Sequence, residues 1–194
     1  MHVQTKLPTK RPFPRILGHI LAGAVLTLVC TSAFAWGVPQ TPNDFITGGG
    51  WILRASGAKA NFGVGGGVKN GAWWGHLEYI DHGTGLNVHG TQVTGYLYVD
   101  THTRDICGFA DTNLYGPVAY HVRVADNDNG GEGRPTSTKD TFIIRLGQNG
   151  VVVYTTEGDA SHELGGGGPG GGDIQLHKGN ASNTAPSTPP VCNI

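Results

Sequence analysis

The stretch TFIIRLGQNGVVVYT, residues 141–155, decides the fold class. Its two halves, Thr141–Leu146 and Val151–Thr155, are rich in β-branched and aromatic residues, which favour strands. Between them lies Asn149-Gly150, a dipeptide that supplies the positive φ angles of a tight hairpin turn. We therefore predict that the two halves are neighbouring antiparallel strands.

The same pattern extends along the rest of the chain. Residues Trp73–Ile80 alternate between two faces, with Leu77 and Tyr79 on one of them. This is the period of a strand that is buried on one side. Similar short runs cover Phe45–Thr47, Trp51–Leu53, Ala58–Val68, Leu86–His89, Val93–Val99, Ile106–Ala110, Val118–Ala125 and Ile174–His177. The sequence therefore predicts an all-β, antiparallel single domain, either a β-sandwich or a jelly-roll-like fold.

Glycine separates many of these runs. It supplies 33 of the 194 residues, against a usual share of about 7%. We expect most glycines to lie at turns between strands. Residues Gly165–Gly172 are almost pure glycine around Pro169, and we expect them to form a flexible loop.

The first 35 residues are typical of a bacterial secretory signal. A leader with four basic and no acidic residues precedes an apolar run, Ile16–Cys30, and small residues follow at Ala33 and Ala35. The run is shorter than the about 20 residues that span a bilayer, and His19 interrupts it. We expect cleavage after Ala35, no transmembrane segment in the mature chain, and a secreted, extracellular or periplasmic location.

The predicted mature chain is acidic. Without the four basic residues of the leader, nine Lys and Arg stand against fourteen Asp and Glu, a net charge of −5. No basic stripe remains, so nucleic acid is excluded as the expected partner. We divide the chain into the signal (1–35), a short linker (36–43), the β-domain (44–179) and a flexible tail rich in Ser, Thr and Pro (180–194).

Two cysteines remain after cleavage, Cys107 and Cys192. In an oxidising compartment they predict one disulfide, which would tie the tail to a central strand. The chain-entropy model gives such a long loop about 4 kcal/mol of stabilisation. The alternative is two unpaired thiols.

Several segments, in this order, resemble the post-COAP domain of bacterial secreted and cell-surface proteins. They are Asp44–Ile52, Ala58–Gly63, Gly75–Tyr79 with Asp81-His82, Val122–Asn127, Asp140–Phe142 and Gly172–Lys178. The resemblance covers nearly the whole mature domain. It implies an extracellular β-domain and brings no established activity or catalytic residues.

An acidic loop is the first candidate site. Asp126, Asp128 and Glu132 lie close together in sequence, and Asp140 follows at the next strand. Calcium takes several oxygen ligands, which carboxylates on a turning loop can supply. The alternative is a solvated turn in which Asp and Asn side chains bond their own backbone. Calcium is thus the one candidate cofactor.

Two adjacent tryptophans, Trp73 and Trp74, are the second candidate. On a strand, one of them must face away from the core, where its ring can stack on a sugar or a protein partner. The alternative is that packing covers both rings.

Catalytic and transition-metal signals are weak. The seven histidines outside the leader show no metal-ligand spacing. Pairs of carboxylates, Glu78 with Asp81 and Glu157 with Asp159, are available for glycoside hydrolysis, but nothing selects them.

The sequence therefore favours a secreted, non-catalytic β-sandwich module with a structural or interaction role at the cell surface. Its expected partner is a cell-surface protein or a polysaccharide. A carbohydrate-binding module that uses an exposed tryptophan is the first alternative. A metal-dependent hydrolase is the second.

Overall fold

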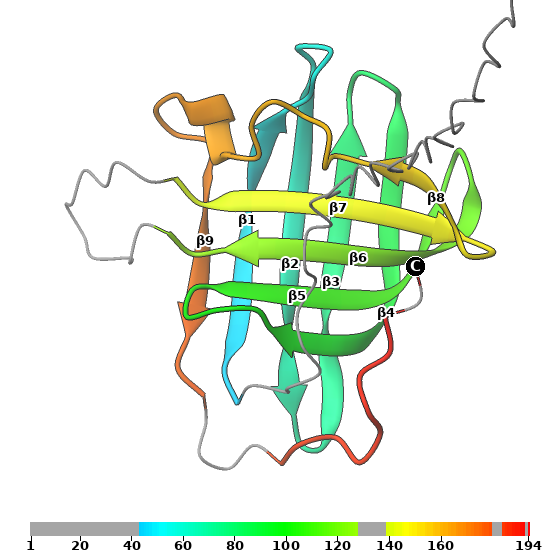
Figure 1. The fold of residues 1–194 in the computed structure, drawn as a ribbon, viewed down its shortest axis with the longest axis vertical. Coiled ribbons are helices and arrows are strands. Elements are labelled where there is room, and N and C mark those ends of the chain that lie inside the picture. The colour runs from blue at the N-terminus through cyan, green and yellow to red at the C-terminus, as the bar shows by residue number, and fades with distance from the viewer. Residues whose placement is uncertain (1–42, 128–138, 180–183, 193) are drawn as a thin grey trace, which may run out of the picture. The chain divides into compact units, whose positions relative to one another are not determined.

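Nine antiparallel strands among the described residues form one curled sheet, a half-barrel (Figure 1). This is a computed structural model that describes residues 43–127, 139–179, 184–192 and 194. The predicted all-β class is confirmed. The strands are β1 (Phe45–Leu53), β2 (Lys59–Lys69), β3 (Ala72–Asp81), β4 (Leu86–Tyr98), β5 (Thr103–Thr112), β6 (Gly116–Ala125), β7 (Thr141–Gln148), β8 (Val151–Thr155) and β9 (Gly172–His177), with a 3₁₀ turn, η1 (Leu164–Gly167).

The strand order follows the chain almost throughout. It runs β8-β7-β6-β5-β4-β3-β2-β1-β9, so that β9 alone returns to pair with an early strand, β1. The predicted hairpin between β7 and β8 is confirmed, with Gln148 opposite Val151. Its turn has φ values of 54° at Asn149 and 76° at Gly150. The turn between β2 and β3 uses the same Asn-Gly chemistry.

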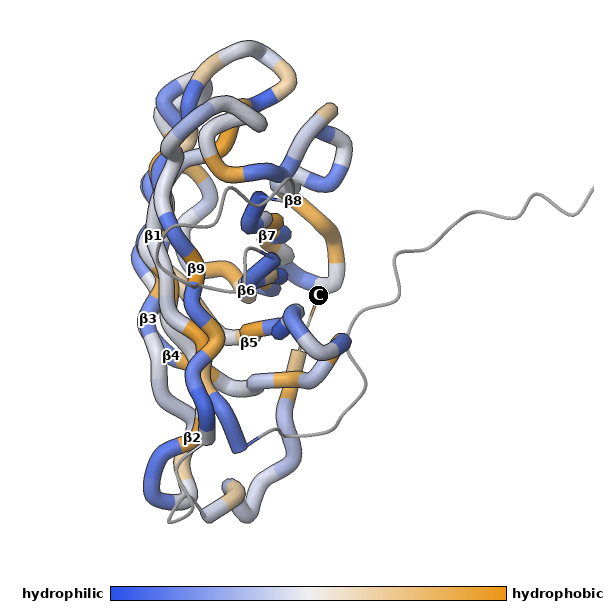
Figure 2. Tube along the Cα trace, turned by 90° about the vertical axis from the view of Figure 1, so that its left-hand side faces the viewer, coloured by the Kyte–Doolittle hydropathy of each residue, from blue (hydrophilic) through white to orange (hydrophobic). Residues whose placement is uncertain are grey.

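The sheet curls into two layers that lie face to face (Figure 2). Strand β4 passes from one layer to the other, and its pairing with β5 shifts register between Gly90 and Gln92 and again between Val93 and Gly95. Such irregularities bend a strand and increase its twist. The two runs that the sequence predicts here, residues 86–89 and 93–99, are therefore one bent strand.

The hydrophobic core fills the space between the layers. Phe62 of β2 stacks on Phe142 of β7 with ring centroids 3.9 Å apart, and Tyr79 of β3 packs beside Phe142 at 5.8 Å. All three side chains are buried. Burying one large apolar side chain contributes about 1.5–3 kcal/mol, so this cluster holds the two layers together.

Many glycines lie inside strands, which corrects the expectation that they mostly separate them. Residues 48–50 belong to β1 and residues 65–67 to β2. A Cβ atom at Gly66 would come within 2.8 Å of Ile106 in the opposite layer, and one at Gly67 within 2.6 Å of the Phe45 Cβ. The glycines therefore allow the layers and neighbouring side chains to approach closely.

The described elements fall within the predicted domain limits, since β1 begins at Phe45 and β9 ends at His177. The predicted signal and nearly all of the linker lie outside the described residues. In the predicted tail, residues 184–192 lie against β4 and the hairpin between β2 and β3. Val191 N donates to Thr94 O (3.0 Å), and Gly71 N donates to Thr184 O (3.1 Å).

Candidate functional site

An open groove of about 440 Å³ lies beside the two adjacent tryptophans. One side comes from the start of β3, another from the middle of β4, and a third from the tail. The lining residues are Gly71, Ala72, Trp73, Trp74, Gly75, Thr91, Gln92, Val93, Pro186 and Thr188. The groove thus contains both aromatic residues that the sequence predicts as ligand-binding candidates.

The groove exists because β3 and β4 separate. Their ladder extends only from Asp81 opposite Leu86 to Glu78 opposite His89. The earlier part of β3 continues to pair with β2, and the later part of β4 continues to pair with β5. Since β4 bends into the other layer at its register shifts, the sheet opens between the two strands. Main-chain edges of both strands therefore face the groove.

The two tryptophan side chains lie on opposite faces of β3, as the alternation of a strand requires. Trp73 packs against the core, whereas the Trp74 ring lies 5.7 Å from the Phe45 ring on the outer face. Both side chains are half-buried. Gly75 follows with a φ of 151°, and a Cβ atom there would lie 2.1 Å from Gly65 O. Glycine at this position lets the tryptophan pair sit close to β2.

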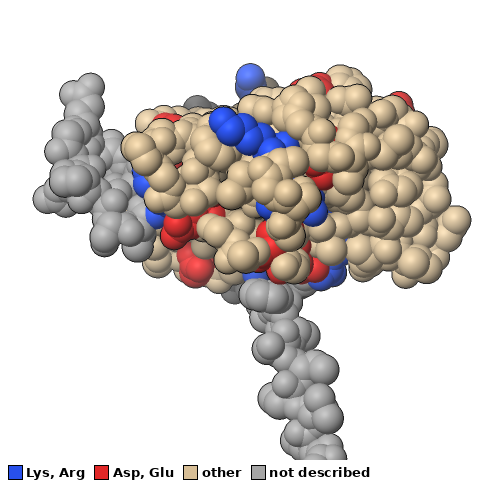
Figure 3. All heavy atoms as spheres, turned by 90° about the horizontal axis from the view of Figure 1, so that it is seen from above, with Lys and Arg blue, Asp and Glu red and all other residues tan. Residues whose placement is uncertain are grey.

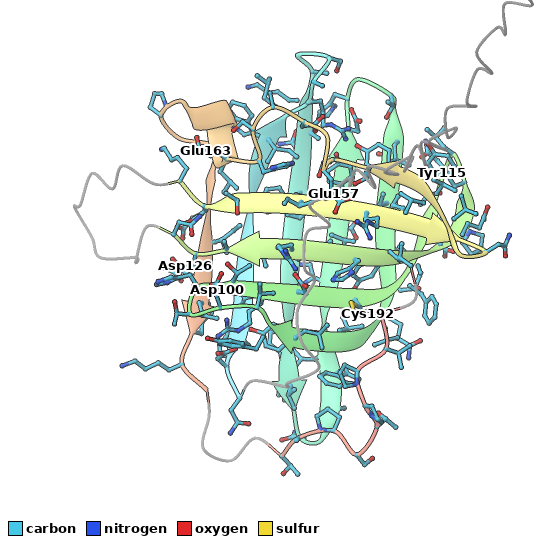
Figure 4. All side chains as sticks on the ribbon, viewed as in Figure 1. Asp100, Tyr115, Asp126, Glu157, Glu163 and Cys192 are labelled. Carbon is cyan, nitrogen blue, oxygen red and sulfur yellow. A yellow bond between two sulfur atoms is a disulfide. The ribbon has the colours of Figure 1, made fainter. Side chains whose placement is uncertain are left out.

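The wall formed by the tail is fixed by a covalent bond. The predicted disulfide between Cys107 of β5 and Cys192 is present, with Cα atoms 5.2 Å apart, and Cys192 lies on the outer side of the sheet (Figure 4). Thr94 of β4 also bonds this segment, because its Oγ1 donates to Val191 O (2.6 Å). The tail is therefore attached at three described points, Thr184, Val191 and Cys192.

A histidine lies next to the disulfide. His121 of β6 is directly opposite Cys107 in the ladder, and its ligand atom and the two cysteine sulfurs lie within 4.8 Å of one another. Among the described residues this is the one group with metal-ligand spacing. Both sulfurs are bonded to each other, so neither is a thiolate ligand in this oxidised form. This neighbour could not be predicted from residue spacing, because the contact is made across two strands.

Buried charge surrounds His121. The Asp105 carboxylate is fully buried and accepts from Arg123 Nε (2.7 Å) and Nη2 (2.9 Å). His121 Nε2 lies 3.2 Å from Asp105 Oδ2. Burial lowers the pKa of His121; Asp105 opposes this effect, and the charges of Arg123 and Arg145 add to it. The imidazole is therefore held in its neutral form.

The two described carboxylates of the candidate calcium loop bind the edge strand β9. Asp140 is buried and accepts from Asn127 N (2.9 Å) and Ile174 N (2.7 Å). Asp126, beside β9 in Figure 4, accepts from Leu176 N at 2.8 Å. Its other oxygen, Oδ1, is buried without a hydrogen bond. The remaining predicted ligands, Asp128 and Glu132, lie outside the described residues.

The carboxylates considered for catalysis are held in ion pairs. Asp81 and Asp159 both contact Arg54, whose Nε lies 2.7 Å from Asp159 Oδ2 and whose Nη1 lies 3.4 Å from Asp81 Oδ2. Glu157 receives two bonds from Arg145 Nη2, at 2.6 and 2.7 Å. Glu78 pairs with the exposed His89.

Arg54 is the centre of a polar cluster that the sequence did not predict. Its Nη1 donates to the Tyr79 hydroxyl (3.0 Å) and to the Tyr154 hydroxyl, and its Nη2 donates to Thr155 O (3.2 Å). The Tyr154 hydroxyl also donates to Asp81 Oδ2 at 2.8 Å. Burial raises the pKa of Tyr79. This cluster ties the end of β8 to the end of β1 by side chains.

A second buried arginine, Arg104, binds the start of β1. Its Nε donates to Asp44 Oδ1 (3.0 Å), which also accepts from the Tyr96 hydroxyl (2.8 Å).

Seen from the end of the domain in Figure 3, basic and acidic atoms lie next to each other in a largely uncharged surface. On this face, opposite charges therefore offset each other locally.

Comparison of the chain with protein-family models, with curated proteins and with solved structures found no match. Among the described residues, no helix is long and apolar enough to span a membrane. The candidate site must therefore be interpreted from its own geometry.

Proposed function

We propose that this protein is a secreted, non-catalytic β-domain with a structural or interaction role at the cell surface. The signal-like leader, the acidic mature chain and the resemblance to the post-COAP domain all support this proposal. The disulfide between Cys107 and Cys192 agrees with an oxidising compartment but is also found in other settings.

The observation that carries the proposal is that the buried carboxylates bind other parts of the fold. Asp81, Asp105 and Asp140 are buried, and the side chain of Asp159 is 5% exposed. Each of the four bonds an arginine or a main-chain amide that joins separate strands or loops. A catalytic acid or base needs access to a substrate proton at hydrogen-bond distance. These groups instead stabilise the fold.

Two measurements test this function. Producing the full chain in a bacterium and sequencing the exported product should give an N-terminus at Trp36, with the protein in the surface or medium fraction. Recovery of the uncleaved chain in the cytosol would contradict the proposal. Incubation with ester and polysaccharide substrates should release no product; turnover that EDTA abolishes would support the metal-dependent hydrolase instead.

Carbohydrate binding is a second candidate function, and the groove at Trp73 and Trp74 is the observation that favours it. Indole rings stack on the apolar faces of sugars, while main-chain and hydroxyl groups bond to sugar hydroxyls. Affinity electrophoresis in gels that contain polysaccharides tests this function. Trp74→Ala should abolish the retardation of the band. The matched control is Trp51→Ala, which removes an indole from β1. This indole lies outside the groove, and its ring centroid is 4.0 Å from Lys59 Nζ.

A further inference from the structure

We propose that the groove at Trp73 and Trp74 binds a neutral glycan, and that the disulfide-anchored tail forms one wall of this binding site. The inference rests on the carbohydrate-binding candidate and adds two things to it, the charge class of the glycan and the part of the chain that completes the site.

The lining of the groove indicates a neutral ligand. None of the described residues that line it carries a charge. Proteins recognise carboxylated or sulfated ligands mainly with Arg and Lys, whose charge-assisted bonds are the strong ones. An anionic sugar bound here would lose its hydration without gaining such a bond. A polymer of uncharged, hydroxylated sugar rings loses less hydration free energy when it binds.

The polar groups present suit hydroxyls. Thr91 and Gln92 are exposed on β4, and Thr188 is exposed on the tail. The Thr91 hydroxyl donates to Phe109 O (3.1 Å), so its oxygen is left to accept from a ligand. Hydroxyl and amide side chains both donate and accept hydrogen bonds, as sugar hydroxyls do. The separated edges of β3 and β4 add main-chain groups along the same line. The half-buried Trp74 also lines the groove, so an aromatic ring and polar side chains are both available to a sugar.

The tail contributes Pro186 and Thr188 to the lining. Pro190 packs so closely on Gly95 that a Cβ atom there would lie 3.1 Å from the proline Cβ. Beyond these contacts, the tail is held by its bonds to the hairpin and to Thr94 and by the disulfide. Breaking the disulfide removes the covalent cross-link between the tail and β5, and leaves hydrogen bonds that compete with water and the packing of Pro190 on Gly95.

A consequence follows for binding. If the tail is a wall of the site, its release removes contacts with the ligand and adds an ordering cost to binding. We expect the affinity for a neutral glycan to fall about ten-fold, which corresponds to the loss of one or two good contacts. The β-domain itself should stay folded, because its core lies between the two layers.

The experiment is a titration followed by tryptophan fluorescence. The probes are laminarin, dextran and mannan, together with the carboxymethylated and the hydroxyethylated form of each. Both forms carry a substituent of similar size on some hydroxyls, and the carboxymethyl group alone adds negative charge. We expect at least one neutral glycan to bind and its carboxymethylated form to bind about ten-fold more weakly than its hydroxyethylated form. Equal or tighter binding of the charged form would overturn the neutral class.

Variants test whether the tail forms one side of the binding site. Cys192→Ser should weaken binding about ten-fold, as should reduction of the disulfide in the unchanged protein. Because Cys192→Ser could impair folding, the double variant Pro186→Ala/Thr188→Ala provides a test with the disulfide intact, and it too should weaken binding. Circular dichroism checks that each variant is folded.

The outcomes separate the two ideas. If the folded tail variants bind as tightly as the unchanged protein while Trp74→Ala does not bind, the tail inference is wrong and the carbohydrate-binding function stands. If no probe binds, or if Trp74→Ala binds like Trp51→Ala, the carbohydrate-binding candidate fails and the inference fails with it.

Discussion

Asp105 on β5 is fully buried and paired with Arg123, whereas the groove beside Trp74 is open and uncharged along its described lining. The two regions differ in what holds their polar groups. Around Asp105, the contacts with His121 and Arg123 join β5 to β6. In the groove, Thr91 and Gln92 are exposed to solvent. In these two regions, therefore, the charged groups join strands of the fold, whereas the uncharged polar groups of the groove are exposed to a ligand.

The largest effect is expected from removing the Asp105 carboxylate. Asp105→Ala removes the fully buried carboxylate that holds the half-buried Arg123 guanidinium. Breaking a buried pair costs about 3–5 kcal/mol, and we expect a loss near the lower end of this range because Arg123 keeps some contact with water. Urea unfolding measures the loss. The matched variant Gln92→Ala, in the groove, should change the free energy of unfolding by less than about 0.5 kcal/mol. Similar losses in the two variants would remove the distinction between the regions.

A smaller effect is expected at the edge strand β9. Asp140→Ala deprives two amides, Asn127 N and Ile174 N, of an acceptor, and should cost about 2–4 kcal/mol. Asp126→Ala removes the acceptor of one amide, Leu176 N, and should cost about half as much. Chemical denaturation gives both values. A larger loss at Asp126 would show that it has a role beyond this bond.

Acid should weaken the region around Asp105 further. Since the pKa of His121 is lower in the folded protein than its ordinary value of 6.5, the unfolded chain takes up more protons below that pH. Stability should therefore fall as the pH drops from 7 toward 5. His121→Gln should remove this part of the pH dependence, and His82→Gln, at an exposed site, should keep it. Parallel curves for both variants would contradict the assignment to His121.

The smallest effect concerns calcium. Three of the four carboxylate oxygens of Asp126 and Asp140 already accept main-chain amides, and Asp126 Oδ1 alone is left without a hydrogen bond. Because calcium takes several oxygen ligands, we expect the melting temperature to differ by less than about 1 °C between calcium and EDTA. A melting temperature several degrees higher in calcium would mean that the buried Asp126 Oδ1 is an ion ligand. Asp126 would then belong, like the groove, to the residues that bind a ligand.

Part of the site could be predicted from local pattern. The Asn149-Gly150 turn and the adjacent tryptophans are signals within a few residues, and so is the strand period around Leu77 and Tyr79. The groove itself could not be predicted, since it depends on where β3 and β4 separate. Arg54 and Arg104 were missed for a related reason: the side chains that accept their hydrogen bonds lie 25 or more positions away in the sequence.

Local and compositional signals were enough to predict the all-β class and the hairpin of β7 and β8, because side-chain period and turn chemistry act over a few residues. They also predicted the disulfide between Cys107 and Cys192, with two unpaired thiols as the alternative and Cys30 assigned to the leader, and the structure contains this bond. The tertiary structure decided that glycines within β1 and β2 allow close packing, that β4 bends between layers, and that the tail lines the groove. These features depend on contacts between distant segments, and local propensity does not encode which distant atoms will meet.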